Sequence, residues 1–223
     1  MVTISFFTYV NNKFWAFKQM YFANKLIKNS KGLVFYKLLG TGAGAGFSLF
    51  PDFKTYSILC VWKDDKSAYE FLNNSIHSLQ ISQKAFSRND YFLQPIHSHG
   101  NWDGINPFTI SKNNFDENFP IAIITRARLN YSKLLEFWNS VPKASKAIKN
   151  AKGVKWFKGI GELPFIQQAT FSVWNNLQSV KDFAYKNIDH AEIVKKTKKR
   201  KWYKEDLFSR FVVLDKKIKV FSN

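Results

Sequence analysis

The hydrophobic positions of the first half of the chain follow two spacings, which predict two helices and four strands. Apolar residues recur three or four positions apart in the segment 13–27, as on one face of a helix. A second helix is expected from about Lys66 to His77 or beyond, with Asp64 or Asp65 at its N-cap. Four runs rich in β-branched and aromatic residues are expected as strands: Val2–Val10, Leu33–Leu39, Thr55–Trp62 and Tyr91–Ile96. The predicted order is therefore β-α-β-β-α-β.

The second half of the chain repeats this order. Its expected strands are Ile121–Leu129, Val154–Ile160, Gln167–Trp174 and Phe211–Leu214. Helical spacing is present in Ser132–Lys149, although Pro142 is expected to kink or divide that helix. Further helical segments are expected at Leu177–Lys186, His190–Lys198 and Trp202–Arg210.

Local matches between the halves indicate an internal repeat. The run Gly32–Gly40 has a pattern of glycine, apolar and lysine positions like that of Gly153–Gly161, which makes Lys37 and Lys158 equivalent. Self-similarity over about half of a chain is typical of two copies of one module. We therefore predict an α+β fold in which tandem duplicated ferredoxin-like modules form a dimeric-α/β-barrel-like arrangement. Its expected parts are a first module at 1–96, a connector at 97–120 and a second module at 121–223.

The composition makes the chain strongly basic. It has 34 lysine and arginine residues against 16 acidic ones, a net charge of +18, which fits nucleic acid, an anionic membrane or an acidic small molecule as partner. The sequence has neither a zinc-finger nor an RNP motif, so no nucleic-acid partner is expected. Its apolar runs are too short to span a bilayer, and its N-terminus lacks the features of a signal peptide. We expect a cytoplasmic protein; peripheral contact with an anionic membrane and the oligomeric state stay open.

The histidines are the candidate metal ligands of the chain: His77, His97, His99 and His190. His97 and His99 are two positions apart in or after a strand, so both side chains can point to one side. A zinc site is not expected, because the chain has one cysteine and no histidine pair at helical chelating spacing. A single helical histidine such as His190 is usually structural, yet haem needs only one proximal imidazole. The apolar residues around the lone Cys60 indicate a buried thiol without a nucleophilic role.

Polar residues also lie in strands that are otherwise apolar. Arg126 needs a partner there, and a haem propionate and a protein carboxylate fit equally well. Strand alternation turns only one of Gln167 and Gln168 inward, where its amide can donate to a bound oxygen species; the other interpretation is an edge or turn amide. The loop 40–46 contains a G-x-G-x-x-A pattern, but a strand follows where dinucleotide binding requires a helix. A hairpin loop, which can cover a pocket, is therefore favoured there.

Longer motifs resemble the spheroidene monooxygenase family over nearly the whole chain. The first half matches at FWAFKQM (14–20) and YKLLGTG (36–42), and the second half begins with IAIITRA (121–127). Further matching motifs are Phe137-Trp138, Val141-Pro142, KGIGE (158–162) followed by Pro164, TFSVW (170–174), His190-Ala191, and WYKEDL (202–207) with Arg210-Phe211. The resemblance implies a haem-dependent monooxygenase that adds oxygen to an acyclic carotenoid and leaves a keto group. It also implies a hydrophobic substrate, O2 or peroxide as the oxidant, and an electron donor whose identity the sequence does not give.

The resemblance implies an axial ligand for the haem iron. His190 is the expected ligand, because the pair His190-Ala191 matches the family, and His77, His97 and His99 are the alternatives.

Other residues are expected around the same haem. The resemblance implies that Arg126 or Gln168 orients the bound oxygen species. Lys37, Lys158 and Arg126 are expected to meet the haem propionates, with ordinary surface lysines as the other interpretation of Lys37 and Lys158.

The chain also departs from the family pattern. It has Ala45 where the family usually has an acidic residue, and Gln167-Gln168 where the family often has histidine. These departures leave open a haem enzyme of the same fold that oxidises or rearranges another small metabolite, such as an amine or an oxime. They also leave open a haem-binding protein without catalytic activity. A basic module that binds RNA or an anionic membrane is a third alternative.

Overall fold

The computed structural model describes residues 1–44, 48, 50–110, 115–186, 192, 195–197 and 199–221. Their contacts divide the chain into two compact units. Unit 1 contains Met1–Thr41, Asp52–Gln94 and the chain from Val213 on, and unit 2 contains Gly42–Pro51 and Pro95–Val212. The chain therefore passes more than once between the units, and the strands β4 (Ser87–Gly100) and β8 (Tyr203–Val220) have residues in both.

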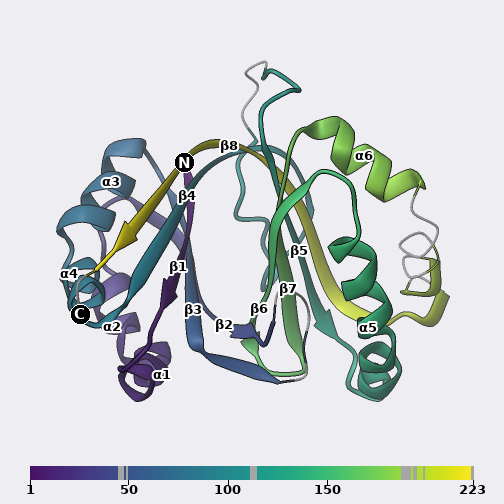
Figure 1. Cartoon of the computed structure of the whole chain (residues 1–223), viewed down its shortest axis with the longest axis horizontal. Helices are drawn as coiled ribbons and strands as arrows, with labels where there is room; N and C mark the ends of the chain where they lie inside the picture. Colours follow the sequence, from purple (N-terminus) through teal and green to yellow (C-terminus); the bar gives the residue numbers. More distant parts are fainter. Residues whose placement is uncertain are drawn as a thin grey trace. The chain divides into compact units, whose positions relative to one another are not determined.

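Unit 1 is an antiparallel sheet with the strand order β4-β1-β3-β2 and helices along one face (Figure 1). Val2 in the central strand β1 lies opposite Val61 of β3 and Leu93 of β4. Besides β4, its elements are β1 (Val2–Thr8), α1 (Lys13–Phe22), α2 (Asn24–Ile27), β2 (Leu33–Gly42), β3 (Pro51–Trp62), α3 (Asp65–Asn74) and α4 (Ile76–Lys84).

Unit 2 has the corresponding order, β8-β5-β7-β6, again antiparallel. Besides β8, its elements are β5 (Ile121–Leu129), a 3-10 turn (Tyr131–Lys133), α5 (Leu134–Lys149), β6 (Val154–Leu163), β7 (Gln167–Trp174) and α6 (Leu177–Lys186). The α+β class and a ferredoxin-like strand order in each unit are therefore confirmed. The barrel-like arrangement of the two modules stays a prediction.

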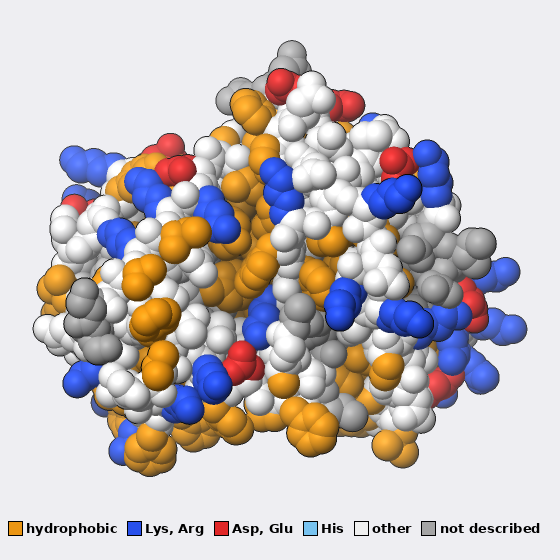
Figure 2. All heavy atoms as spheres, in the orientation of Figure 1, with side chains coloured by type: hydrophobic (Ala, Val, Ile, Leu, Met, Phe, Trp, Pro, Cys, Tyr) orange, Lys and Arg blue, Asp and Glu red, His pale blue; other side chains and the backbone are white. Residues whose placement is uncertain are grey.

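Basic side chains are spread over the visible face of the molecule, and acidic side chains are fewer (Figure 2). This distribution agrees with the net charge of +18. Among the described residues, no helix combines the length and the apolar character that a membrane crossing requires.

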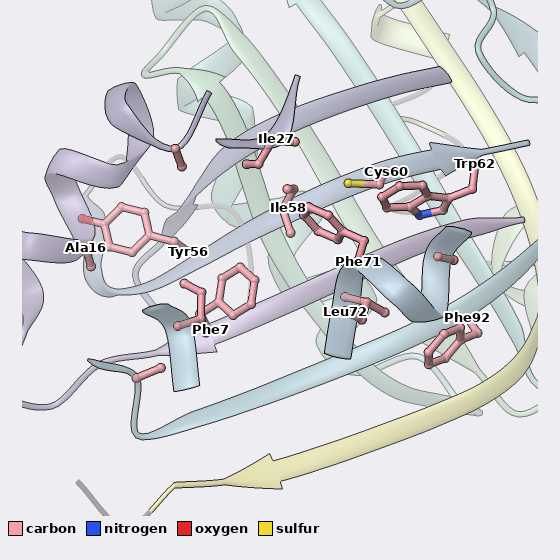
Figure 3. Packing of buried hydrophobic residues seen from close by; sticks show 14 of the residues in the cluster. Phe7, Ala16, Ile27, Tyr56, Ile58, Cys60, Trp62, Phe71, Leu72 and Phe92 are labelled. Atoms are coloured by element: carbon pink, nitrogen blue, oxygen red, sulfur yellow. The ribbon is translucent and has the colours of Figure 1, made fainter. Parts of the chain in front are cut away.

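The core of unit 1 lies between its helices and the sheet (Figure 3). Phe71 and Leu72 of α3 contribute to the same buried cluster as Phe7 of β1 and Trp62 of β3. Cys60 belongs to this cluster, is 1% exposed, and burial raises the pKa of its thiol, which confirms the prediction of a buried cysteine.

The two units share a tight approach between a glycine and a serine. Gly32 and Gly153 both have positive φ angles, 73° and 85°. A Cβ atom at Gly32 would lie 2.2 Å from Oγ of Ser67, and one at Gly153 would lie 2.3 Å from Oγ of Ser179. Glycine is therefore needed at both turns for its backbone freedom and for its lack of a side chain.

The second unit also contains a clear error of the sequence prediction. The expected helix at Trp202–Arg210 is wrong, because this segment belongs to the long strand β8. Leu207, Ser209 and Phe211 are buried at every second position, which is the period of a strand. Pairing with β5 satisfies the backbone over this segment, so tertiary context overrides the local preference of its charged residues for a helix.

Three helical predictions need smaller corrections. The helix that begins after Asp64 is two helices, because Ser75 ends α3 and its Oγ accepts the N–H of Ser78 in the first turn of α4. The segment 13–27 is likewise divided, between α1 and α2. Pro142, in contrast, does not divide α5, which continues through it from Leu134 to Lys149.

Candidate functional site

The sheet of unit 2 has one face covered by helices and one face turned away from them. Ile121, Ile123 and Ala127 of β5 pack in the clusters that contain residues of α6 and α5. Because successive residues of a strand point to opposite faces, Ile124 and Arg126 lie on the other face. We call this second face the open face of unit 2. Its described residues are mostly apolar and buried: Ala122, Ile124, Ile160, Ala169, Phe171, Val173, Leu207 and Phe211.

Arg126 is the buried charge of the open face. Its side chain is 1% exposed, and its guanidinium is paired with three carboxylates. Nη1 contacts Glu205, and Nη2 lies 3.2 Å from Asp103 and 3.9 Å from Glu162. Of the two partners that the sequence left equal, the structure thus places protein carboxylates against Arg126. Its buried Nε has no hydrogen-bond partner among the described residues and stays available as a donor.

A tight turn after β4 brings the first of these carboxylates to Arg126. Asp103 and Gly104 both have positive φ angles, 55° and 83°, and the flanking residues Trp102 and Ile105 form a β-bridge. Asp-Gly is the sequence that such a turn favours. The indole of Trp102 lies 5.6 Å from the guanidinium carbon of Arg126, which adds a cation–π contact.

The other two carboxylates come from the neighbouring strands. Glu205 of β8 pairs with Arg128 in the strand register, so it lies on the same face as Arg126. Glu162 lies at a register shift of β6, between Gly161 and Leu163, and its Oε1 accepts the indole N–H of Trp102 at 2.6 Å.

The surroundings of Glu205 keep it ionised. Burial raises the pKa of this carboxyl, but the N–H of Gly104, the guanidinium of Arg126 and the N–H of Asp103 together hold it below its ordinary value. The cluster therefore carries three carboxylates around one guanidinium, which fixes the position of Arg126 against the sheet.

Lys158 is another cation of the open face. It lies opposite Phe171 in the β6–β7 pairing, on the same face as Arg126, and is 9% exposed. Its Nζ donates to the carbonyl oxygen of Gly44 at 2.8 Å, which ties the described part of the glycine-rich loop to β6. Lys37, the equivalent position of unit 1, is half-buried, and its Nζ lies 5.5 Å from the ring of Phe35.

Gln168 lies on the opposite face of the sheet from Arg126. It pairs with Ala127, whereas Arg126 pairs with Ala169, so the two predicted oxygen-orienting side chains point in opposite directions. The amide of Gln168 donates to the carbonyl of Leu163 at 3.4 Å. The structure thus brings Arg126 and Lys158 to one face and leaves Gln168 on the face covered by helices.

The described histidines are divided between the units: His77 lies in unit 1, and His97 and His99 lie in unit 2. His190, the expected axial ligand, lies outside the described residues. His77 is 5% exposed in unit 1, where its ring stacks on Phe71 and meets Phe7 edge-on, with centroid distances of 5.6 Å and 5.9 Å. Burial and, to a lesser extent, Arg88 lower the pKa of His77 to about 4, so its imidazole is neutral.

His97 and His99 form an exposed pair near the end of β4. Nδ1 of His99 lies 3.4 Å from Nε2 of His97, and the ring of His99 stacks on Phe208 at 5.4 Å. The prediction that both side chains point to one side is confirmed. Burial, Arg210 and His99 lower the pKa of His97. Among the described residues, no cluster of three or more ligating side chains suited to a metal ion is present.

Sequence reasoning did not find the partners of Arg126, nor a second buried ion pair in unit 1. There Nε of Arg88 lies 2.9 Å from Oδ2 of Asp90, and Nη1 of Arg88 donates to Oγ of Ser78 at 2.6 Å. Oδ1 of Asp90 accepts the hydroxyl of Ser5 at 2.6 Å. Signals were present in the Asp103-Gly104 dipeptide and in the spacing of Arg88 and Asp90, two positions apart in one strand, whereas the contact of Asp90 with Ser5 joins distant segments.

Comparison with known sequences gives three relatives. The spheroidene monooxygenase of Cereibacter sphaeroides is 36% identical over 220 residues, which cover 96% of this chain and 66% of that protein. The spheroidene monooxygenase of Rubrivivax gelatinosus is 30% identical over 183 residues, which cover 82% of this chain and 70% of that protein. The spheroidene monooxygenase of Rhodobacter capsulatus is 29% identical over 205 residues, which cover 90% of this chain and 83% of that protein. No family model matches the chain.

Comparison with solved structures adds relatives in fold. An aldoxime dehydratase has a TM-score of 0.62 at 11% identity, over 96% of this chain and 82% of that one. A second aldoxime dehydratase, in complex with butyraldoxime, has a TM-score of 0.58 at 11% identity, over 96% and 80% of the two chains. At such low identity these likenesses show the fold alone.

Proposed function

The chain belongs to the spheroidene monooxygenase family, and from this membership we propose that it is a haem-dependent monooxygenase acting on an acyclic carotenoid. The observation that carries the proposal is the sequence identity of 30–36% to two proteins of that name over most of the chain. The chain spans about two thirds of the length of the Cereibacter sphaeroides relative, 66%, so the activity and the substrate of the whole relative belong to the proposal.

The open face of unit 2 supports a hydrophobic substrate. Phe171 and Phe211 lie on this face, and Trp156 and Phe108 meet them edge-on, with centroid distances of 6.0 Å and 5.0 Å. Phe171 and Phe211 are 0% exposed and form apolar packing beneath this face, so Trp156, which is partly exposed, offers the apolar area that a long polyene can contact. We propose that the carotenoid contacts this face beside Arg126.

The charged groups of the open face suit a cofactor with carboxylates. Nε of Arg126 is a buried donor without a partner among the described residues, and the ammonium of Lys158 is buried on the same face. Arg126 can hold a haem propionate, because an acceptor there would satisfy its desolvated donor, and the positive charge of Lys158 would attract the same carboxylate. When bound, haem supplies the redox chemistry that activates oxygen.

His190 stays the proposed axial ligand. His77 is a poor alternative, because two aromatic rings and its burial leave no free side of the imidazole. The exposed pair His97 and His99 gives little protection from water, which a reactive oxygen species requires.

The visible spectrum of the purified protein with added hemin tests the cofactor. We expect a stoichiometric Soret band that is lost in His190→Ala and kept in the matched variant His99→Ala. A wild-type protein without the band contradicts the haem proposal, and a His190→Ala variant that keeps the band contradicts only the assigned ligand.

Turnover tests the reaction separately. The haem-loaded protein, supplied with spheroidene and either an electron donor with O2 or peroxide, is expected to give an oxygenated carotenoid that chromatography and mass spectrometry detect. A protein with a Soret band but without product under both conditions would be a haem-binding protein, and the enzymatic part of the proposal would be wrong.

A further inference from the structure

The helix α1 presents its aromatic side chains to solvent instead of to the core. Phe14, Phe17 and Tyr21 are 71%, 53% and 72% exposed, and Phe22 is 49% exposed. Ala16 is the buried residue of this helix. Exposing large rings to water is unfavourable, so their gathering on one element indicates a surface that another partner covers.

The exposed rings form one aromatic patch, which we define as Phe14, Phe17, Tyr21, Phe22 and Phe53. The ring of Phe53 on β3 is 52% exposed and meets Phe17 edge-on at 6.2 Å. Tyr21 and Phe22 are in edge-on contact at 5.2 Å. Figure 2 shows hydrophobic side chains gathered at the lower edge of the molecule, where Figure 1 draws α1.

The charge around the aromatic patch is mostly positive, with Asp52 beside Phe53 as an acidic neighbour in the sequence. Residues 1–51 contain six lysines and no aspartate or glutamate. Lys13, Lys18 and Lys25 are exposed on α1 and α2, and Nζ of Lys18 lies 4.5 Å from the ring centre of Phe14. A surface of this kind is complementary to a negatively charged and partly apolar partner.

We propose that the aromatic patch docks unit 1 on the interface of an anionic lipid bilayer. Aromatic rings favour the headgroup region, and flanking lysines are attracted to anionic lipids. A helix with ten residues is too short to span the bilayer, but it can lie in the interface with its rings inserted. Trp15 and Met20 pack against the core of unit 1, so docking needs no rearrangement of α1.

The docking proposal is independent of the proposed reaction, although it would place the protein at the phase that dissolves a carotenoid. Its test therefore uses neither substrate nor cofactor turnover. A failure of either proposal leaves the other intact.

Sedimentation with vesicles tests the docking surface. The full chain is mixed with vesicles of phosphatidylcholine alone or of phosphatidylcholine with phosphatidylglycerol, and the bound fraction is measured against lipid concentration. We expect tighter binding to the anionic vesicles. The double variant Phe14→Ser/Tyr21→Ser should bind at least about 10-fold more weakly, because its two most exposed rings of α1 no longer insert.

A matched control removes equally exposed apolar side chains elsewhere. Leu135 and Tyr185 are each 84% exposed in unit 2, and the variant Leu135→Ser/Tyr185→Ser should bind like the wild type. If this control loses as much binding as Phe14→Ser/Tyr21→Ser, or if the latter loses none, the assigned surface is wrong. Circular dichroism of both variants verifies that their folding is unchanged.

A charge-matched pair of variants separates local attraction from net charge. Lys13→Glu/Lys18→Glu/Lys25→Glu should weaken binding to anionic vesicles by at least about 100-fold, since each lysine near the surface contributes about fivefold. The same change at Lys146, Lys149 and Lys152, which are also exposed, should have a much smaller effect. Equal losses would mean that net charge alone drives binding, which overturns the proposal.

Discussion

In unit 1 the buried arginine lies on the face of the sheet that the helices cover, whereas in unit 2 it lies on the open face. Arg88 is opposite Phe7 of β1 and donates to Ser78 of α4, within the helix-covered core. Arg126 is on the face turned away from α5 and α6, with carboxylates that are partly exposed. Both arginines are buried, but among the described residues Nε of Arg88 is paired with Asp90, whereas Nε of Arg126 has no hydrogen-bond partner.

Positions that are equivalent in the strand registers of the two units also differ in charge. Val2 lies opposite Val61, and Ala122 lies opposite Val173, each one position before the tryptophan that ends its strand. Four residues further on, unit 1 has Phe6 where unit 2 has Arg126. Phe6 meets Tyr91 edge-on at 6.4 Å, an apolar contact without a charge. The open face of unit 2 therefore carries a charged group at a position where unit 1 carries an apolar ring.

The largest effect is expected from breaking the enclosed ion pair of unit 1. Asp90→Ala leaves Arg88 buried without its carboxylate, which should lower the free energy of unfolding by about 3–5 kcal/mol. Urea denaturation measures the loss. The exposed Asp206 on β8 is the matched control, and Asp206→Ala should change the stability by less than about 0.5 kcal/mol. Similar losses in both variants would contradict the contrast between the faces.

A second effect depends on pH. The pKa of His77 is lowered from 6.5 to about 4 in the folded state. Between these pH values His77 is therefore protonated in the unfolded chain and neutral in the folded chain. Stability from this group is complete above pH 6.5 and is lost as the pH falls towards 4, by roughly 3 kcal/mol. His77→Phe should remove this slope in denaturation curves taken across that range. An unchanged slope would show that His77 does not titrate as its burial requires.

A smaller effect is expected at the open face. Arg126→Met should cost about 2 kcal/mol of unfolding free energy, less than the loss at Asp90, because the three carboxylates keep 18–40% exposure and can be hydrated. The pKa of Glu205 is lowered in the folded state, so its stabilisation exists above its ordinary pKa and disappears as the pH falls through the lower value. Removing the guanidinium of Arg126 should bring the pKa of Glu205 closer to its ordinary value. The unfolding free energy that is lost on acidification should therefore be smaller in the variant. A loss as large as that of Asp90→Ala would contradict the expected difference between the two faces.

The smallest loss of stability is expected at the glycine that approaches a serine in each unit. Gly32→Ala and Gly153→Ala should destabilise the protein by about 1–2 kcal/mol and by similar amounts, since both positions combine a positive φ with a close serine. Gly104→Ala, where φ is 83° but no atom lies within 4 Å of the added Cβ, isolates the backbone contribution and should cost less. Clearly unequal costs at Gly32 and Gly153 would show that the two turns are not equivalent.

Local patterns predicted the elements whose hydrophobic spacing is unambiguous. The bounds of β5, β7 and α6 agree with the sequence prediction. The strand prediction at Phe211–Leu214 falls within β8, but the first part of β8 was missed because Lys204 and Glu205 favour a helix, and only the pairing with β5 shows that this segment alternates between two faces.

The site was predictable only in part. An arginine between Thr125 and Ala127 in the largely apolar strand 121–129 indicated that Arg126 requires a partner, and its burial agrees with this need. Its contact with Glu205 joins positions 79 residues apart, so no local pattern specifies it. The opposite orientation of Gln168 follows from the register between β5 and β7, which a single sequence does not contain.

The division of β8 between the units has a consequence for biosynthesis. Its later residues, from Val213 on, complete unit 1, where the N–H of Phe221 donates to the carbonyl of Phe86 at 2.9 Å. The strand β8 is the neighbour of β4 in the sheet. A ribosome translates its last part after all of unit 2, so β4 of the nascent unit 1 is an edge strand until then. Unit 1 therefore matures only after unit 2 has left the exit tunnel, and its open edge is the place where a chaperone is most needed.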